Sequence, residues 1–198
     1  MKKVFAIAAA LLLMGTTAFA QSFGAGYVQS TANNSTANGF YAGFGYSAEI
    51  MPGLSLNPGL YYEFLTSTTG ASLGSWASYS GKTTEHYVNI PLHLSFAYSF
   101  APTFKLFVYG GPTANVGIAS STKVSGSVLG FGGSDTIDNY KDTNYSRFDI
   151  MLGGGIGAEV MNKIRLTVGY DMGMLDRDNS DNGTLKRNRL TAGVAFVF

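Results

Sequence analysis

The feature that most restricts the fold of this chain is a period-two alternation of apolar and small or polar residues. It recurs in segments of about ten residues. The clearest segment alternates Ile164, Leu166, Val168, Tyr170, Met172 and Met174 with Arg165, Thr167, Gly169, Asp171 and Gly173. Such alternation gives a β-strand one apolar face. After Gln21 no apolar run approaches the roughly 18 residues that a transmembrane helix needs, so the pattern predicts a membrane β-barrel.

Eight such segments are expected to form strands. They cover about 23–31, 40–50, 54–65, 88–100, 104–118, 148–160, 164–174 and 189–198. Their connections alternate in length. Met51-Pro52-Gly53, Ala101-Pro102-Thr103 and Asn162-Lys163 are tight turns, whereas 32–38, 66–84, 119–146 and 176–186 are longer. We therefore predict an all-β, eight-stranded antiparallel up-and-down transmembrane β-barrel. Its short turns and both termini would lie on the periplasmic side, and its long loops outside the cell.

The first twenty residues read as a signal peptide. Lys2 and Lys3 precede an apolar run from Val4 to Leu13, and Ala18-Phe19-Ala20 has the form of a cleavage site. We therefore predict a signal peptide over 1–20 and a barrel domain over 21–198. The mature chain would carry 11 basic and 12 acidic residues, which gives no electrostatic case for binding nucleic acid. The chain has no Cys, which excludes disulfides and thiolate chemistry.

Composition indicates that the apolar face points outward, into lipid. Only 13% of residues are charged, against about 25% in an ordinary soluble domain. A soluble barrel would need a densely charged outer face, whereas the polar face here is mostly Gly, Ser, Thr and Asn. That composition suits the crowded interior of a barrel of eight strands. Aromatic residues gather near both ends of the expected strands, as in the two aromatic girdles of membrane barrels.

Three stretches resemble a known family. Leu56-Asn57-Pro58-Gly59-Leu60-Tyr61-Tyr62, Tyr87-Val88-Asn89-Ile90-Pro91-Leu92-His93-Leu94 followed by Val108-Tyr109-Gly110-Gly111-Pro112, and the terminal Gly193 to Phe198 carry the likeness. The chain resembles small outer-membrane barrels of the OmpA/OmpX type, and most closely the PorT-like "outer membrane protein beta-barrel" family of Bacteroidetes. The resemblance implies the bacterial outer membrane as location. It also implies a C-terminal signal for the barrel-assembly machinery at Val194, Phe196 and Phe198.

Ionisable residues on the inward face are the strongest candidates for lumen chemistry. Glu49, Lys105, Glu159 and Arg165 fall near the short turns, and Glu63, Asp149, Asp171, Arg187 and Arg189 fall higher. Charges in a narrow lumen are costly unless they are paired, so we predict ion pairs that plug the barrel. The alternative is a gated path for protons or ions. Steady large openings in a planar bilayer would contradict the plugged barrel.

An enzymatic alternative rests on His93-Leu94-Ser95, an H-x-S pair like that of lipid A deacylases. In such chemistry the His activates the Ser and a carboxylate orients the His. The alternation turns both side chains inward, away from lipid, and assigns no acidic partner. We therefore predict a lumen histidine bonded to a neighbouring Tyr or Asn, no catalytic residues, and a solvated His86 near the outer rim.

The long loops are rich in Ser, Thr, Gly and Asn, and they are the expected place for binding. Contact candidates are Trp76, Tyr79, Phe131 and Tyr140. A solvated or partly β-extended rim is the alternative. Asp135, Asp138 and Asp142 lack the spacing of a calcium loop. No zinc, phosphate-loop or nucleotide pattern follows the leader, so we predict no metal and no cofactor.

These observations predict a structural or loop-mediated interaction protein rather than an enzyme. Its expected partners are outer-membrane lipid and lipopolysaccharide, the barrel-assembly machinery during insertion, and an extracellular ligand or host surface; the chain is expected to be a monomer. A narrow pore or small-solute transporter is the second hypothesis, and a lipid-modifying enzyme is the third.

Overall fold

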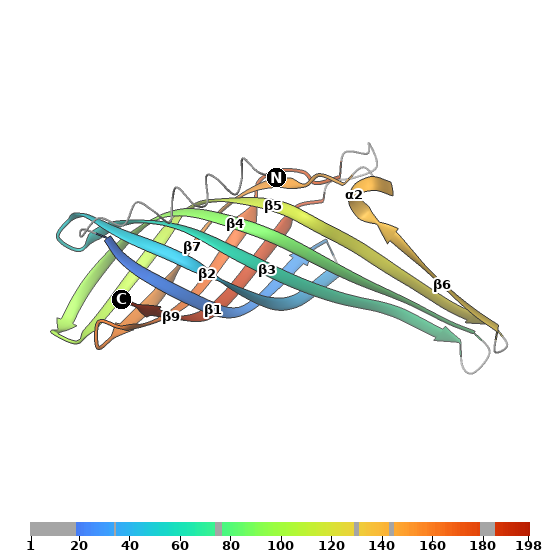
Figure 1. Ribbon diagram of the computed structural model, residues 1–198, viewed down its shortest axis with the longest axis horizontal. Coiled ribbons are helices and arrows are strands. Elements are labelled where there is room, and N and C mark those ends of the chain that lie inside the picture. Colours follow the sequence, from blue (N-terminus) through green and yellow to red (C-terminus); the bar gives the residue numbers. More distant parts are fainter. Residues whose placement is uncertain (1–18, 34, 74–76, 129–130, 143–144, 179–184) are drawn as a thin grey trace.

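The computed structural model describes residues 19–33, 35–73, 77–128, 131–142, 145–178 and 185–198. These residues are almost entirely β-structure (Figure 1). The elements are β1 (Phe19–Ala32), β2 (Ser35–Met51), β3 (Leu54–Leu73), β4 (Ala77–Ala101), β5 (Phe104–Val128), β6 (Phe131–Asp138), α2 (Asn139–Asp142), β7 (Phe148–Val160), β8 (Ile164–Gly173) and β9 (Arg187–Val197). The predicted signal peptide lies almost wholly outside the described residues.

Within the described part of the chain, eight strands close into a ring in which every neighbour is antiparallel. The order around the ring is β1, β2, β3, β4, β5, β7, β8 and β9, and β9 pairs again with β1. At the closing seam Gln21 and Phe198 exchange backbone hydrogen bonds of 3.2 and 2.9 Å. The predicted eight-stranded up-and-down barrel is confirmed. Closure satisfies the backbone groups that an open sheet would leave unpaired.

The tight turns lie at one end of the barrel, here called the short-turn end. The β7–β8 turn places Met161 and Asn162 at φ values of 57° and 53°. Two consecutive residues with positive φ form the kind of two-residue turn that matches the twist of paired strands. The Asn162 side chain also donates to the carbonyl oxygen of Pro102 in the neighbouring turn, at 3.1 Å. The conformation of this turn and its hydrogen bond to the neighbouring turn therefore fix the geometry of the short-turn end.

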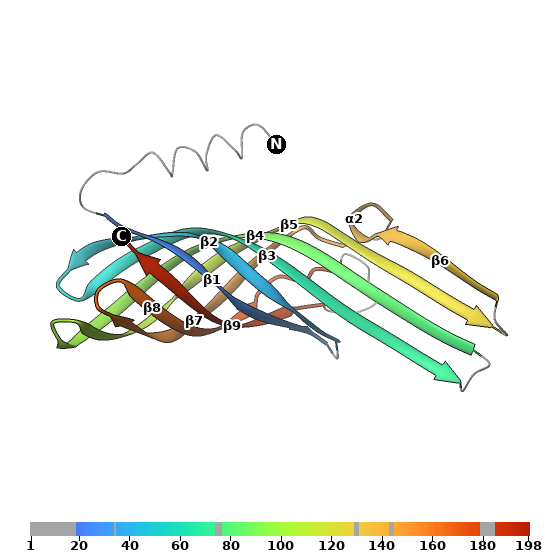
Figure 2. The ribbon, with the colours of Figure 1, turned by 60° about the horizontal axis from the view of Figure 1, so that its bottom comes forward.

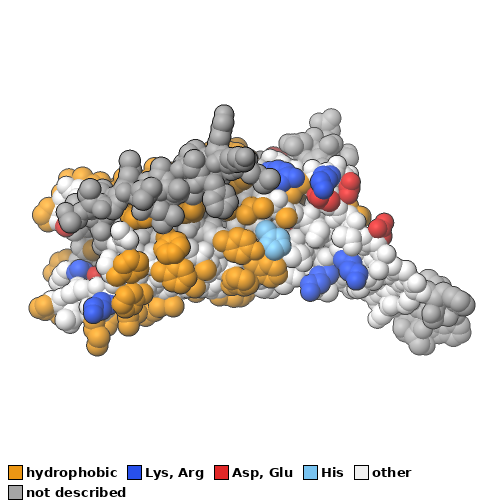
Figure 3. Space-filling model, in the orientation of Figure 1, with side chains coloured by type: hydrophobic (Ala, Val, Ile, Leu, Met, Phe, Trp, Pro, Cys, Tyr) orange, Lys and Arg blue, Asp and Glu red, His pale blue; other side chains and the backbone are white. Residues whose placement is uncertain are grey.

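Apolar side chains cover the outside of the barrel. Along β8 the exposed positions alternate strictly with less exposed ones, and Ile156 on β7 is 65% exposed. On the face seen in Figure 3, hydrophobic side chains gather over the barrel in a broad area, here called the apolar belt. The predicted outward direction of the apolar face is therefore confirmed. Among the described residues no helix is long and apolar enough to cross a membrane.

Two predicted loops turn out to be mostly β-sheet. β3 and β4 continue through much of 66–84, and β5, β6 and α2 occupy much of 119–146. Ser67–Leu73, Ala77–Glu85, Ser120–Val128 and β6 form a sheet that extends beyond the barrel, here called the protruding sheet (Figure 2). Both of its faces are open to solvent, so its strands do not need the apolar alternation by which the barrel strands are recognised. β6 pairs only with β5 and is not part of the ring.

Candidate functional site: the lumen and the protruding sheet

A charged network crosses the middle of the lumen. Glu63 of β3 is fully buried and accepts hydrogen bonds from Arg187, from Arg189 at 3.0 Å and from Asn89 at 2.9 Å. Arg189 also donates to Asp171 of β8, with its Nη2 at 2.7 Å and its Nε at 3.0 Å. The network therefore joins strands that lie on opposite sides of the ring.

This network is stable only as a unit. Removing one partner of a buried ion pair leaves an uncompensated charge, which typically destabilises a protein by about 3–5 kcal/mol. Here two guanidinium groups balance two carboxylates, and Asn89 supplies a further donor to Glu63. Four of the predicted lumen residues are thus brought together in one buried network inside the barrel.

A second cluster lies near the short-turn end. Glu159 of β7 is directly opposite Lys105 on β5 and Arg165 on β8, and it pairs with them at 3.2 and 2.8 Å. Glu49 does not join this layer, contrary to our expectation. It is exposed at the β2–β3 turn, where its carboxylate accepts a hydrogen bond from the backbone N–H of Gly53 at 3.2 Å. The layer therefore holds one acid and two bases.

Asp149 also departs from the prediction of paired lumen charges. Its side chain is buried, and it forms no ion pair with a described residue. One carboxylate oxygen instead accepts the backbone N–H of Leu175 at 3.2 Å. Asp149 therefore anchors the start of the β8–β9 connection.

The far mouth of the barrel is closed by Arg177, which the sequence did not single out. Its fully buried guanidinium donates to the Tyr87 hydroxyl at 3.0 Å and to the Ser146 carbonyl at 3.2 Å. It also lies 4.5 Å from the centre of the Tyr145 ring, and burial raises the pKa of Tyr145 to about 12. In the sequence, Arg177 lies between Asp176 and Asp178, and such a run of charged residues is typical of a solvated loop.

Tyr140 belongs to the same cluster of side chains around Arg177 at the far mouth. We expected it to be a surface contact, but its ring stacks on Tyr145 with the centroids 5.6 Å apart. Its hydroxyl points inward, where a side chain at Gly117 would collide with it, and Arg177 donates to it at 3.4 Å. The guanidinium of Arg147 covers the Tyr140 ring at 4.4 Å. A Tyr in a long loop gave no sequence signal for this inward packing.

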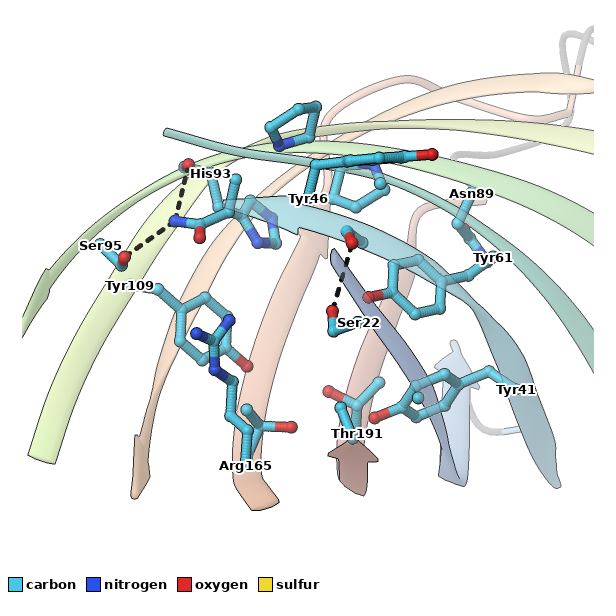
Figure 4. A pocket seen from close by; sticks show the side chains of 18 of the residues that line it. Ser22, Tyr41, Tyr46, Tyr61, Asn89, His93, Ser95, Tyr109, Arg165 and Thr191 are labelled. Carbon is cyan, nitrogen blue, oxygen red and sulfur yellow. Dashed lines mark hydrogen bonds between the residues drawn. The ribbon is translucent and has the colours of Figure 1, made fainter. Parts of the chain in front are cut away.

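A cavity of about 160 Å³ lies between the two charged clusters. Figure 4 shows Tyr41, Tyr61 and Tyr109 directing their hydroxyl groups into it from three strands. Glycine makes room for these rings, because a Cβ at Gly169 would collide with the Tyr109 hydroxyl. The charged network at Arg189 and Asp171 closes the cavity on one side. Tyrosine rings and buried charges together line this part of the lumen.

The H-x-S pair is not assembled as a catalytic dyad. His93 bonds to the Thr113 hydroxyl at 3.1 Å, and its ring stacks on Tyr109 at 5.3 Å. Ser95 instead accepts a hydrogen bond from Asn57 at 2.8 Å (Figure 4). The partner of His93 is thus a Thr hydroxyl rather than the Tyr or Asn that we expected. Neither Thr113 nor Asn57 acts as a base toward Ser95, so these contacts do not activate the serine.

His86, the other histidine, lies on the outer face of β4. Its Nδ1 is 2.5 Å from the Tyr62 hydroxyl, and its ring is 5.3 Å from Phe64. These neighbours make it less solvated than we expected. His86, Tyr62 and Phe64 mark the edge of the apolar belt that is nearer to the protruding sheet.

The protruding sheet is held together by hydroxyl contacts as well as by its backbone. Ser78 and Ser127 approach to 2.9 Å, and Thr83 and Thr122 to 3.0 Å. Tyr79 on β4 is 52% exposed, as expected of a contact residue. Trp76 and the side chain of Phe131 lie outside the described residues. Asp138 pairs with Lys141 at 3.1 Å, which lowers the pKa of Asp138.

Val194, Phe196 and Phe198 share the outward face at the closing seam, each at least half exposed. The C-terminal strand therefore presents its apolar ridge to the outside. Its reading by the assembly machinery stays a prediction.

Comparisons with known proteins agree with this architecture. The model of the "outer membrane protein beta-barrel domain" family matches residues 12–179. No curated protein sequence matches the chain. Among solved structures, Neisserial surface protein A is 13% identical, with 93% of this chain and 99% of that one covered and a TM-score of 0.49. Ail of Yersinia pestis is 14% identical, with coverages of 90% and 98% and a TM-score of 0.41. OprG of Pseudomonas aeruginosa is 11% identical, with coverages of 93% and 98% and a TM-score of 0.44. The chain therefore belongs to the outer membrane protein beta-barrel family and is a protein of the bacterial outer membrane.

Proposed function

We propose that this protein is a sealed barrel that anchors the protruding sheet outside the cell as a surface for binding an extracellular partner. The observation that carries the proposal is that three barrel strands, β3, β4 and β5, continue without interruption into that sheet. A sheet continuous with a closed barrel is held rigidly, whereas a free loop would lose conformational entropy on binding.

The sealed lumen favours display over transport. The network around Glu63 and the closure at Arg177 obstruct the barrel at two levels. A solute would have to displace buried, paired charges at both levels. We assign no catalytic role, because His93 and Ser95 bond to different partners.

The free edge of β3 is the best candidate for the contact itself. The pairing of β2 with β3 ends at Asn38 and Thr66, so among the described residues Ser67–Leu73 has a strand neighbour on one side only. Exposed edges are usually protected by Lys, Pro or bulges. Ser67–Leu73 contains none of these and no charged residue. An extended segment of a partner could add to this edge through main-chain hydrogen bonds.

The test compares cells that display the full protein with cells that display a variant in which a short Gly-Asn-Gly turn replaces residues 67–83. The barrel strands are retained, so the variant should fold and insert. Adhesion to immobilised host-cell protein should fall to the level of cells lacking the protein. A matched variant that shortens only 124–135 keeps the β3 edge and should still bind.

Conductance separates display from the transport alternative. Purified protein in a planar bilayer should show no steady openings. Large openings in the full protein, or unchanged adhesion after removal of 67–83, would contradict the proposal.

A further inference from the structure

Two lysines face each other directly on the protruding sheet. Lys82 of β4 and Lys123 of β5 are cross-strand partners, and both are exposed. Directly opposed side chains on antiparallel strands have Cβ atoms about 4.5–5.5 Å apart, and like charges in this position destabilise the sheet. A bound anion would therefore relieve the repulsion between the two ammonium groups.

No described carboxylate supplies that anion. Neither lysine forms an ion pair within the described residues. Glu85, the nearest acid on β4, accepts a hydrogen bond from the buried Tyr87 at 2.6 Å. Asp138 lies on β6 two residues beyond Thr136, the partner of Lys123, and it is paired with Lys141. The two ammonium groups thus remain available to a ligand.

The position of the pair shows where the ligand must come from. Lys82 lies four residues beyond His86 on β4, so it shares the outward face of the apolar belt. Four residues correspond to about 13 Å along a strand, or about 10 Å along the membrane normal at the usual strand tilt. Figure 3 shows Lys and Arg side chains on the surface just beyond the belt. A face that continues the apolar belt by this distance would lie at the height of the lipid headgroups.

We propose that Lys82 and Lys123 bind phosphate groups on the sugar headgroups of the glycolipid that surrounds the barrel in the outer leaflet. Thr68 and Thr136 are the cross-strand neighbours of the two lysines and place hydroxyl donors on the same face. Ammonium and hydroxyl donors together suit phosphate oxygens, and basic residues near an anionic membrane surface attract its headgroups. The site fixes the depth and orientation of the sheet over the membrane, separately from binding at the β3 edge.

The decisive experiment compares the wild type with Lys82→Ser/Lys123→Ser in three surroundings. The matched control is Lys163→Ser/Lys186→Ser, which removes the same charge at two exposed lysines that form no ion pair with a described residue. In a neutral detergent, the Lys82/Lys123 variant should be as stable as the wild type or more stable, because the like-charge contact is gone. In nanodiscs with phosphorylated lipopolysaccharide, its Tm should fall by about 4 °C relative to the wild type. With dephosphorylated lipopolysaccharide this deficit should disappear.

Inorganic phosphate in detergent distinguishes the source of the anion. If millimolar phosphate leaves the Tm of the wild type unchanged, the headgroup assignment stands, since free phosphate is too weakly bound. If phosphate alone stabilises the wild type and lipopolysaccharide adds nothing, the headgroup assignment is overturned. It is equally overturned if the control variant loses as much stability in phosphorylated nanodiscs as the Lys82/Lys123 variant. Failure of adhesion assays at the β3 edge would leave this result unaffected.

Discussion

The same strands, β3, β4 and β5, run through two regions that obey different rules. Inside the barrel they carry Glu63, Asn89 and Asn115, which are buried and hydrogen-bonded to other lumen side chains. On the protruding sheet they carry Lys82 and Lys123, which are exposed and opposed to each other. One backbone thus supports a region where each polar group needs a partner and one where water supplies it.

The difference follows from what surrounds each region. Lipid on the outside and a closed wall leave lumen side chains only one another as partners, so an unpaired group is expensive. Solvent on both faces of the sheet makes most substitutions there nearly neutral. Stability is therefore concentrated in the barrel, and the sheet is free to carry contacts. The predictions below test this contrast by pairing a lumen change with a change on the sheet.

The largest effect is expected from Glu63→Gln. The change leaves Arg187 and part of Arg189 buried without a charge partner, which should lower the free energy of unfolding by about 3–5 kcal/mol. Asp135→Asn on β6 is the matched change and should alter it by less than about 0.5 kcal/mol. Urea unfolding in detergent measures both. Equal effects would remove the contrast between the two regions.

A smaller loss is expected from Arg177→Leu at the far mouth. The guanidinium donates hydrogen bonds to Tyr87, Ser146 and Tyr140. Leucine leaves no buried charge behind, so we expect a total loss of about 1.5–3 kcal/mol, the contribution of a single hydrogen bond to a charged group. We expect faster hydrogen exchange around Ser146 while the network at Glu63 stays protected. Lys186→Leu, which changes an exposed cation of the β8–β9 connection that forms no ion pair with a described residue, should leave this exchange unchanged.

Substitutions of Gly by Ala compare the barrel and the protruding sheet with the same chemical change in each. A Cβ at Gly169 would collide with the Tyr109 hydroxyl, so Gly169→Ala should cost about 1–3 kcal/mol through overpacking. Tyr109→Phe in the same chain should recover part of the loss, because the colliding oxygen is removed. Gly133→Ala on β6 meets nothing within 4 Å and should be neutral. Thermal unfolding of the three variants tests this, and the absence of rescue would argue against the collision.

The smallest effect concerns the pH dependence of the β8–β9 connection. Backbone N–H groups of Leu185 and Asp178 donate to the carboxylate of Asp176 and lower its pKa. Because the pKa of Asp176 is lowered in the folded state, its carboxylate helps to order the connection above the usual pKa of Asp, about 3.9. That order is lost as the pH falls through the lowered pKa. Proteolysis of this connection should therefore increase only in acid. In Asp176→Asn it should show little dependence on pH.

The sequence identifies the residues that carry charge in the lumen better than it identifies their ion-pair partners. The register Lys105–Glu159–Arg165 follows from alternation plus the neighbouring order of β5, β7 and β8. Alternation could not show that Glu49 turns away to cap Gly53, because that depends on the local shape of a turn. It also could not assign partners across the lumen, since strand register and barrel shear set which side chains meet.

For a related reason the sequence did not single out Arg177, and it predicts a surface contact at Tyr140 rather than inward packing. Both lie outside the barrel strands, where no periodicity predicts which way a side chain points. The sequence predicts long loops at the protruding sheet, with a partly β-extended rim as the alternative, and the structure bears out that alternative. A sheet wetted on both faces has no apolar face, so alternation does not mark its strands. Its Ser and Thr residues suit strands as well as turns.

The amino-acid order by itself determined the number of ring strands, the face that each turns to lipid and the identity of most interior charges. These depend on the chemistry of each position and on the two-residue repeat of a strand, which are local properties. Only the tertiary structure decided which charges meet, what closes the mouth and where the sheet continues beyond the membrane. Those outcomes arise from the closure of eight strands into one wall, which brings together side chains as far apart in the chain as Glu63 and Arg189.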